Sequence, residues 1–360
     1  MFSMKPCRVV LGEAARNVAS GTSRFLMVAG FVSAALLITF FIDTSYAHQI
    51  QLDAAKFQRA GASIQTIRSD GNISPQTCTA LNHGNLRAGA LRVSDTKVTA
   101  SALPASEIPT YTVTSSFITL LFPDNPPASS SGVFISQEVA IALGYTTGDL
   151  LVTTAGAASI GGVYSFPSDG RRSDLRYAVV VPSTSQEKFD ECWAESWPNE
   201  QNLTQLLRSS ETLHSDGSAN SAEYSQVNST LGQNFDGFRR FSARPTAALT
   251  VVAGLAALVF MIFLGLRRKL EIASLLHAGF RKPDLWAIAF TETLAAILSS
   301  LLIAAPIAAV ASSYVGTISI TPIEIFRNNF LVLSVCAIVG TSLPFLLVRE
   351  NRLFQYFKDR

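Results

Sequence analysis

The sequence predicts a helical membrane protein with four transmembrane helices and a large extracytoplasmic α+β domain between the first helix and the second. Three observations predict this class. Four apolar stretches approach or exceed the length of about 20 residues that a helix needs to cross a bilayer. Charged residues make up 15% of the 360 residues, whereas an average soluble domain has roughly 25%. A long polar segment separates the first apolar stretch from the other three.

The first apolar stretch, residues 25–42, is expected to be an uncleaved span. Basic residues precede it, as in a secretory signal peptide, but its apolar run is longer than the roughly 7–15 residues that are typical of one. The sequence TSYAHQ that follows resembles a cleavage site only loosely. The remaining stretches are residues 246–266, 285–315 and 330–348.

The distribution of lysine and arginine predicts the orientation, because cytoplasmic loops carry an excess of both. Residues 1–24, 267–284 and 349–360 each have more basic than acidic side chains. Residues 43–245 carry 14 basic and 19 acidic side chains. Four spans place the three basic segments on one side, so both termini are expected in the cytoplasm and the long segment outside.

The expected organisation follows from these assignments. It comprises a cytoplasmic amphipathic segment (1–24), span one (25–46), the extracytoplasmic domain with its stalks (47–245), span two (246–266), a cytoplasmic helix (267–284), span three (285–315), a short external loop (316–329), span four (330–348) and a cytoplasmic tail (349–360).

The outer segment mixes two kinds of pattern. Alternating runs with β-branched residues predict strands at residues 91–100, 111–122, 149–154, 161–166 and 176–182. Apolar residues at helical spacing predict helices at residues 136–145, 185–197 and 203–213. This mixture favours an α+β domain. The Ser/Asn-rich residues 215–234 are interpreted as a mobile loop.

Two of the four cysteines, Cys78 and Cys192, lie in the outer segment. An oxidising compartment favours their pairing, and closing so long a loop stabilises by roughly 4–5 kcal/mol in the chain-entropy model. The alternative is two buried free thiols.

Catalysis, metal binding and nucleic-acid binding find little support. The outer histidines His48, His83 and His214 lie outside any nucleophile or metal pattern, and a surface turn is the simpler interpretation of His83 than a general base. The acidic residues from Glu187 to Glu195 are interpreted as the solvated face of a helix. The chain has no Walker A pattern, so it is expected to hydrolyse no ATP alone and to hold no cofactor. Membrane topology explains its basic segments, so no nucleic-acid partner is expected.

The segment between spans two and three predicts a short amphipathic helix. Ile272, Leu275 and Leu276 share one side, and Gly279 is a natural stop. Such a helix can dock into a groove of a partner, or it can lie on lipid headgroups. The residues alone leave both open.

This segment resembles the cytoplasmic coupling segment of the MacB/FtsX-like permeases of ABC transporters. The residues that match the pattern of that family are Arg268, Glu271, Ile272, Ala273, Leu275, Ala278 and Gly279. Two positions depart from it, because Leu276 stands where a basic residue is usual and Ala278 replaces a larger apolar residue. Glu292 in span three corresponds to an acidic position that is common in the family. The resemblance implies that ATPase coupling rests on Arg268, Glu271, Ile272, Leu275, Leu276, Gly279 and Phe280.

A second match lies in the outer segment, at residues 131–151. Gly144, Gly148 and Asp149 carry it, with Gly144 expected to end a helix and the Gly148–Asp149 pair expected to turn the chain into a strand. This motif supports the fold and not a ligand. Residues 13–25 resemble the cytoplasmic lead-in to span one of the same family.

The resemblance implies a permease subunit of a bacterial plasma membrane that lacks its own motor. Such permeases pair with a second copy or a paralogue and recruit a separate ATP-binding subunit, which holds ATP and Mg. Movement of the outer domain would then extrude a lipid, lipoprotein or peptide, or regulate an envelope enzyme. The competing hypotheses are a sensor or scaffold whose outer domain binds a ligand, and a membrane-anchored hydrolase.

Overall fold

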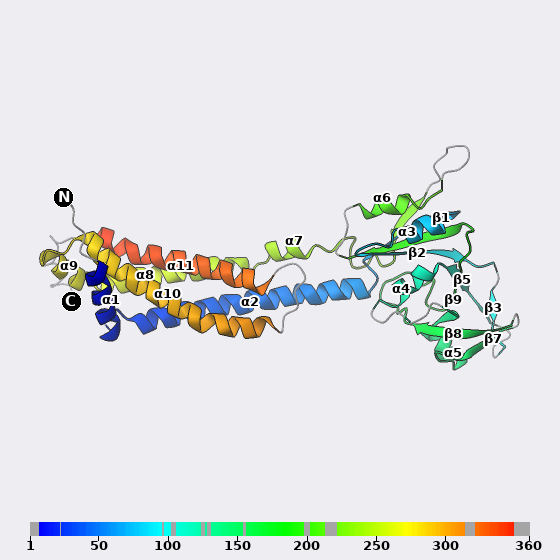
Figure 1. Ribbon diagram of the computed structural model, residues 1–360, viewed down its shortest axis with the longest axis horizontal. Helices are drawn as coiled ribbons and strands as arrows, with labels where there is room; N and C mark the ends of the chain where they lie inside the picture. Colours follow the sequence, from blue (N-terminus) through cyan, green and yellow to red (C-terminus); the bar gives the residue numbers. More distant parts are fainter. Residues whose placement is uncertain are drawn as a thin grey trace. The chain divides into compact units, whose positions relative to one another are not determined.

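The structure is a computed structural model that describes residues 7–21, 23–95, 97–101, 106–123, 127, 131–153, 156–197, 202–212, 222–313 and 321–348. The chain forms two compact units (Figure 1). The first unit comprises Met1–Leu52 and Gly237–Arg360, and the second comprises Asp53–Asp236.

Seven helices build the described part of the first unit. They are α1 (Cys7–Ala19), α2 (Phe25–Arg59, whose end belongs to the second unit), α7 (Gly237–Ser242), α8 (Ala247–Arg267), α9 (Lys269–His277), α10 (Lys282–Ser312) and α11 (Pro322–Leu347). Four helical segments, Phe25–Arg59, Gly237–Arg267, Lys282–Ser312 and Pro322–Leu347, are long and apolar enough to cross a membrane. Within this unit, α2, α8, α10 and α11 run side by side, with α1 and α9 at one end and α7 at the other (Figure 1). The expected set of four spans is confirmed.

Close contact between α8 and α11 depends on two glycines. A Cβ atom on Gly265 would lie 2.4 Å from Cγ of Pro344, and one on Gly340 would lie 2.5 Å from the carbonyl oxygen of Leu258. Small residues allow two helix backbones to approach closely inside a membrane, where van der Waals packing drives association. These glycines therefore set the spacing of the pair.

The start of α11 is fixed by local chemistry. Thr321 accepts a hydrogen bond from the backbone N–H of Glu324, and the Glu324 carboxylate accepts one from the backbone N–H of Thr321. Pro322 occupies the first helical position, where its missing N–H costs nothing. This capping box fixes the residue at which the helix begins.

The second unit is an α+β domain with a nine-stranded mixed sheet in the order β11-β1-β10-β2-β5-β9-β6-β8-β7. Its strands are β1 (Ile64–Ile73), β2 (Leu86–Val93), β5 (Thr110–Val113), β6 (Val133–Ser136), β7 (Leu150–Thr153), β8 (Gly156–Tyr164), β9 (Val179–Pro182), β10 (Phe189–Ser196) and β11 (Glu223–Gln226), while β3 (Val98–Thr99) and β4 (Glu107–Ile108) form a separate pair. Its helices are α3 (Pro75–Ala80), η1 (Ser115–Phe117), α4 (Ile118–Leu121), α5 (Gln137–Leu143) and α6 (Leu203–Arg208). The α+β class is confirmed.

The prediction of a helix at residues 185–197 is wrong, because this segment contains the central strand β10. It pairs with β1 on one side and β2 on the other, both antiparallel. The ring of Trp193 packs against Phe117 at 5.1 Å, while Cys192 lies in the core on the opposite side of the sheet. Both faces are covered, so apolar residues occur without strict alternation, and this pattern was mistaken for helical spacing.

Two further expectations are corrected. Strand β11 lies within the presumed loop 215–234 and pairs with β1 from Gln65↔Gln226 to Arg68↔Glu223; residues 213–221 are outside the described part. The run 111–122 continues the strand only to Val113 and then forms η1 and α4. Phe117 fits there because its backbone lies against Gly89, where a Cβ atom would approach its Cα to 2.4 Å.

Candidate functional site

The turn between α8 and α9 holds an ion-pair network centred on Arg268. Its guanidinium donates to both carboxylate oxygens of Glu271 (Nε–Oε2 3.0 Å, Nη2–Oε1 2.9 Å) and to Glu292 of α10 (Nη1–Oε2 2.8 Å). The other Glu292 oxygen accepts a hydrogen bond of 2.7 Å from the side-chain amide of Asn17 on α1. Four residues from three parts of the chain thus meet at one point.

The network is mostly buried, so salt and solvent screen it less than a surface ion pair. The side chain of Glu292 is 7% exposed and that of Arg268 is 22% exposed. Burial alone would lower the pKa of the Arg268 guanidinium, but the hydrogen bonds and charges of Glu271 and Glu292 outweigh it and raise this pKa. Because the partners are planar and the contact with Glu271 has two points, the network fixes orientation as well as distance.

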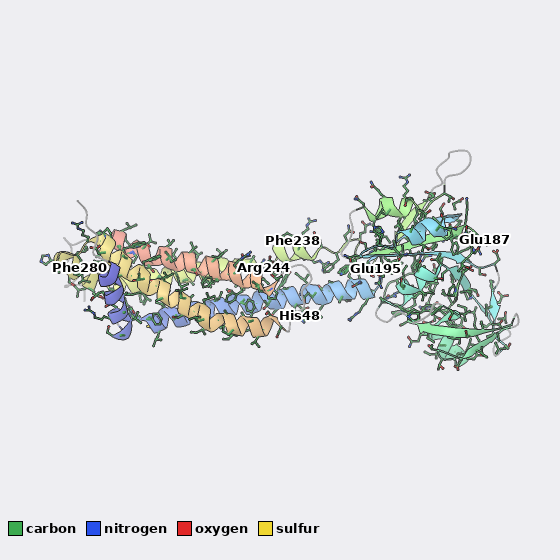
Figure 2. All side chains as sticks on the ribbon, viewed as in Figure 1. His48, Glu187, Glu195, Phe238, Arg244 and Phe280 are labelled. Carbon is green, nitrogen blue, oxygen red and sulfur yellow. A yellow bond between two sulfur atoms is a disulfide. The ribbon has the colours of Figure 1, made fainter. Side chains whose placement is uncertain are left out.

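Helix α9 packs its apolar side against its own bundle. Ile272 and Ala273 are buried, and Leu275, Leu276 and Phe280 are half-buried. They pack with Leu285 of α10 and with Phe345 and Val348 at the end of α11. Figure 2 labels Phe280 at this end of the first unit. The apolar side of α9 therefore contacts its own chain, and its outward surface comprises other residues.

That outward surface includes Ser274, His277, Ala278 and Gly279, all of which are exposed. Gly279 ends the helix with a φ of +90°, a conformation that favours glycine. The chain then turns back into α10 at Lys282, whose ammonium donates to the carbonyl oxygens of Phe345 and Val348. The exposed surface of α9 and of the turn after it therefore consists of small and polar residues.

A second network, not expected from the sequence, lies at the other end of the first unit, where Figure 2 labels Arg244. Asp43 of α2, with its side chain 2% exposed, accepts two hydrogen bonds from Arg244 (2.9 and 3.2 Å). It also accepts from Thr246 (2.8 Å) and Asn329 of α11 (3.5 Å). Thr250 of α8 donates to the amide oxygen of the same asparagine at 3.0 Å. The signal was present, because a lone carboxylate in an apolar stretch needs a partner.

The three motif residues of the outer segment have structural positions. Gly144 follows α5 with a φ of +72° and Gly148 has a φ of +97°. The carboxylate of Asp149 accepts from the backbone N–H and the hydroxyl of Thr146, at 2.7 and 2.9 Å, immediately before β7. The backbone donor is the main reason, and the hydroxyl the second, that the pKa of Asp149 is lowered.

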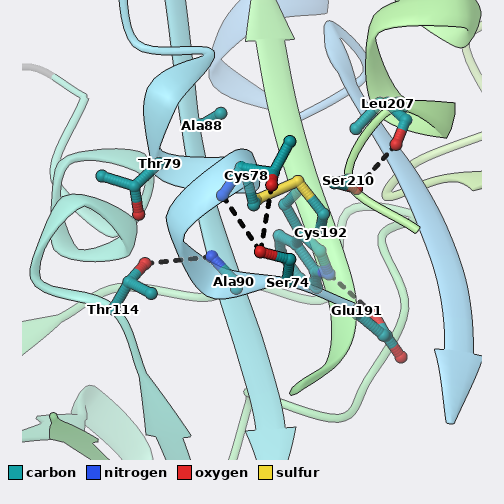
Figure 3. The surroundings of a disulfide bond; sticks show 12 residues. Ser74, Cys78, Thr79, Ala88, Ala90, Thr114, Glu191, Cys192, Leu207 and Ser210 are labelled. Carbon is teal, nitrogen blue, oxygen red and sulfur yellow. Dashed lines mark hydrogen bonds between the residues drawn. A yellow bond between two sulfur atoms is a disulfide. The ribbon is translucent and has the colours of Figure 1, made fainter. Parts of the chain in front are cut away.

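Cys78 of α3 and Cys192 of β10 form a disulfide, with Cα atoms 5.9 Å apart (Figure 3). Both residues are buried in the core that lies between this face of the sheet and helices α3 and α6. The bond attaches α3 to the central strand of the sheet.

Three of the four acidic residues of 187–195 form ion pairs, and the fourth, Asp190, accepts from the backbone N–H groups of Gly71 and Val93. Glu191 is buried and accepts from Arg172 at two points and from the indole N–H of Trp193. Glu195 is also buried and pairs with Arg87. They lie on a strand and not on the solvated face of a helix, which corrects the earlier interpretation.

The described histidines His48 and His83 are both exposed. His83 is exposed in the turn before β2, and His214 is outside the described residues. Among the residues that the structure describes, no group of three or more His, Cys, Asp or Glu side chains is placed to hold a metal ion.

No family model matches the sequence, and no curated protein matches it. Part of the chain is similar in structure to the periplasmic region of MacB from Actinobacillus actinomycetemcomitans, at 10% identity and a TM-score of 0.33, over 47% of this chain and 91% of that one. It is also similar to a domain of a putative permease protein from Porphyromonas gingivalis, at 12% identity and a TM-score of 0.32, again over 47% and 91%.

Proposed function

We propose that this chain is the permease subunit of an ABC transporter, which couples ATP hydrolysis by a separate subunit to movement of its extracytoplasmic domain. The observation that carries the proposal is the attachment of α9 to the bundle through Arg268. The resemblance of residues 267–294 to the coupling segment of MacB/FtsX-like permeases supports it, as does the order of four spans around one large α+β domain.

Force applied to α9 has a direct route into the spans. Arg268 connects α9 to Glu292 of α10, and through this carboxylate to Asn17 of α1. The buried residues Ile272 and Ala273 hold the same helix against α10 and α11. A helix fixed at both its charged and its apolar contacts moves with its neighbours, so a partner that displaces α9 displaces the bundle.

The contact surface for the ATP-binding subunit is then the exposed side of α9 around Ser274, His277 and Gly279. The excess of lysine and arginine in residues 1–24, 267–284 and 349–360 supports a cytoplasmic position for this surface and for both termini, with residues 47–245 outside. Two permease copies, or one copy and a paralogue, complete the transporter. Few charged side chains occur within the spans, which favours work on a lipid, lipoprotein, peptide or envelope enzyme at the outer face over a polar channel.

Purification from the native membrane in mild detergent tests the class. We expect a stoichiometric ATP-binding protein to accompany the chain. Its absence, repeated after nucleotide trapping and crosslinking, would instead support the sensor or scaffold.

Two variants test the coupling residues in the reconstituted complex. Glu271→Lys reverses the charge that faces Arg268, and Gly279→Pro forbids the positive φ that ends α9. We expect both proteins to reach the membrane but to lose most of the stimulated ATPase activity. Asp95→Lys, an equivalent reversal at an exposed position of the second unit, is the control and should retain it. Normal stimulation in the first two variants would refute the assignment to α9.

A further inference from the structure

The last turns of α2, from Asp53 to Arg59, belong to the second unit. Gly61, with a φ of +70°, follows the helix, and the backbone N–H groups of Gly61 and Ala62 donate back into its last turn at 2.9 and 3.0 Å. This is the hydrogen-bond pattern of a Schellman motif. Three further carbonyl oxygens at this end, those of Arg59, Ala60 and Ala62, accept hydrogen bonds from side chains that lie elsewhere in the same unit.

Two segments of the second unit, residues 168–174 and 226–230, supply these side chains, and we call them the clip. The Arg171 guanidinium donates to the first of the three oxygens at 2.8 Å, the Asn228 amide donates to the second at 3.0 Å, and the Gln226 amide donates to the third. A cation and amide donors suit this position, because the C-terminus of a helix carries a partial negative charge. Residues that lie 112 to 168 positions away along the chain thus hold the end of α2.

The capping side chains are themselves held in place. The Arg171 guanidinium forms a two-point ion pair with Asp169, at 2.8 Å for each bond, and lies over the ring of Phe166, 4.8 Å from its centroid. Asn228 is fully buried, its amide also donates to the carbonyl oxygen of Asp169 at 3.2 Å, and its oxygen accepts from the hydroxyl of Thr230 at 2.6 Å. The two segments of the clip are therefore bonded to each other as well as to α2.

The clip also contacts the central strand of the sheet. Arg172, the neighbour of Arg171, donates to both carboxylate oxygens of Glu191 on β10 at 2.8 and 2.9 Å. Glu195 of the same strand accepts from the side-chain amide of Gln58 on α2 at 3.2 Å. Helix α2 is thus connected to β10 both directly and through the clip.

The segment by which the chain leaves the second unit is fastened at the same place. Phe57 of α2 is buried, and its ring lies 5.7 Å from that of Phe235 and 6.2 Å from that of Trp197, which are themselves 5.9 Å apart. Phe235 directly precedes Asp236, the last residue of the unit. The entering helix and the leaving segment are therefore packed together within this unit.

We propose that the clip makes the last turns of α2 and the nine-stranded sheet one rigid body, with Arg171 and Asn228 as the positioning residues, so that a rotation or tilt of α2 turns the whole outer domain. Without the clip the chain would pivot at residues 60–63, where each residue has two soft dihedral angles. The inference deepens the proposed function and rests on it, because that function requires the outer domain to receive movement from the spans.

The stiffness of this joint can be measured on the full chain alone, in nanodiscs. Spin labels are placed at Lys56→Cys on α2 and at Ile141→Cys on α5, both exposed positions, with Cys7→Ser and Cys336→Ser as background. Helix α5 packs against β6, which lies five strands from β1 in the sheet, or about 24 Å. We expect one narrow distance between the two labels.

Arg171→Ala should loosen the joint, because it removes the guanidinium that caps α2. We expect the distance between the labels to spread into a broad distribution, and the amide of Ala62 to exchange its hydrogen roughly 10- to 160-fold faster, the range for loss of a hydrogen bond to a charged group. Arg171→Lys retains a charged donor on a long side chain and should restore part of the narrow distribution.

Arg92→Ala is the matched control. Arg92 also pairs with an acid, Glu187 at 2.7 Å, and lies over a phenylalanine ring, that of Phe189 at 5.6 Å, but these partners lie at the start of β10. It should leave the distance between the labels narrow. Equal distributions in Arg171→Ala and Arg92→Ala would overturn the proposal.

A second pair of labels, at Asn85→Cys and Ile141→Cys, separates the joint from the fold. Both positions are exposed and neither lies on α2, so this distance should stay narrow in Arg171→Ala. If it broadens as well, Arg171 maintains the fold of the unit and not the joint, and the proposal is wrong.

The reconstituted complex with the ATP-binding subunit tests the use of the joint. Labels at Ile141→Cys and at Ile323→Cys, an exposed position of α11, follow movement of the second unit against the first. We expect nucleotide trapping to shift this distance, and to shift it less in Arg171→Ala. An equal shift in both would overturn the part of the clip in transmission. No shift in either would count against the proposed function, whereas the rigid joint is decided by the chain alone.

Discussion

Asp43 and Arg244 form a two-point ion pair although 201 positions separate them in the sequence. The carboxylate lies in α2, and the guanidinium stands immediately before α8 and over the ring of Phe241, 3.9 Å from its centroid. Since the Asp43 side chain is almost completely buried, this pair holds the first and second spans together at one fixed point.

Breaking this pair should destabilise the first unit strongly. Asp43→Ala leaves the Arg244 guanidinium partly buried without its carboxylate, and removal of one partner of a buried pair costs about 3–5 kcal/mol. Unfolding of the full chain in mixed micelles measures the loss. Arg16→Ala, which breaks a mainly exposed pair with Glu13, should cost no more than about 1 kcal/mol. Equal losses would mean that the Asp43 site carries no special stability.

Arg268→Lys should loosen α9 although it keeps the charge. A lysine ammonium cannot reproduce the planar fork that contacts Glu271 at two points and Glu292 at a third. We expect a loss of about 1.5–3 kcal/mol, seen as amide hydrogen exchange of α9 that is roughly 10- to 160-fold faster. In Arg267→Lys the charge stays near the ring of Phe263, over which Arg267 lies at 4.5 Å, and exchange should be unchanged. Similar exchange in both variants would contradict the central role of Arg268.

Gly265→Ala should separate α8 from α11. The added Cβ atom would meet Pro344 at 2.4 Å, and overpacking of this kind typically costs 1–3 kcal/mol. Gly30→Ala in α2 is the control, because a Cβ atom there meets nothing within 4 Å and alanine favours a helix by up to about 1 kcal/mol. Thermal unfolding of both variants in one detergent decides the prediction, which fails if Gly265→Ala is as stable as Gly30→Ala.

Removal of the disulfide should weaken the second unit. The double variant Cys78→Ser with Cys192→Ser is expected to lose about 2–5 kcal/mol of unfolding free energy, as for other native disulfides. A non-reducing peptide map of the natural protein should show the two cysteines in one linked pair. Free thiols at both positions would refute the bond.

The carboxylate of Asp149 should titrate at a pH below the ordinary pKa of an aspartate side chain. The Thr146 donors lower its pKa in the folded state. Its contribution to folding stability is therefore fully present above the unfolded pKa of about 3.9 and is lost as the pH falls through the lower folded pKa. Thr146→Val removes the hydroxyl donor and keeps the backbone N–H. We expect it to raise the pKa of Asp149 partway toward the unfolded value in a carboxyl NMR titration; an unchanged midpoint would show that the hydroxyl contributes nothing.

The sequence sufficed for features that depend on composition and length. Four spans and the α+β class follow from apolar runs and turn chemistry. The compartment favoured the pairing of Cys78 with Cys192 over two free thiols, and the structure shows the bond. It failed at β10, because a strand covered on both faces has no alternation that distinguishes it from a helix. Strand β11 was not predicted because its sequence is polar, and its pairing with β1 is a long-range contact that local patterns do not indicate.

Only some residues of the candidate sites could be predicted from the sequence, for a similar reason. Arg268, Glu271 and Glu292 could be named from the resemblance, but the part of Asn17 depends on how α1 packs against α10. The sequence indicates that Asp43, a carboxylate beside an apolar stretch, needs a partner. Only the fold identifies Arg244 and Asn329 as its partners. Contacts between residues far apart in the chain are decided by packing, which local patterns do not specify.

The strand order also determines when the sheet can be completed during synthesis of the chain. The first strand of the sheet, β1, pairs with β10 and β11, the last two strands to be made. At roughly 5–20 residues per second, the 114 positions between Cys78 and Cys192 take about 6–23 s to synthesise. During that interval β1 lacks both neighbours and β2 lacks one, so a ribosome that stops before β10 leaves a chain with unpaired strand edges and not a smaller version of the domain.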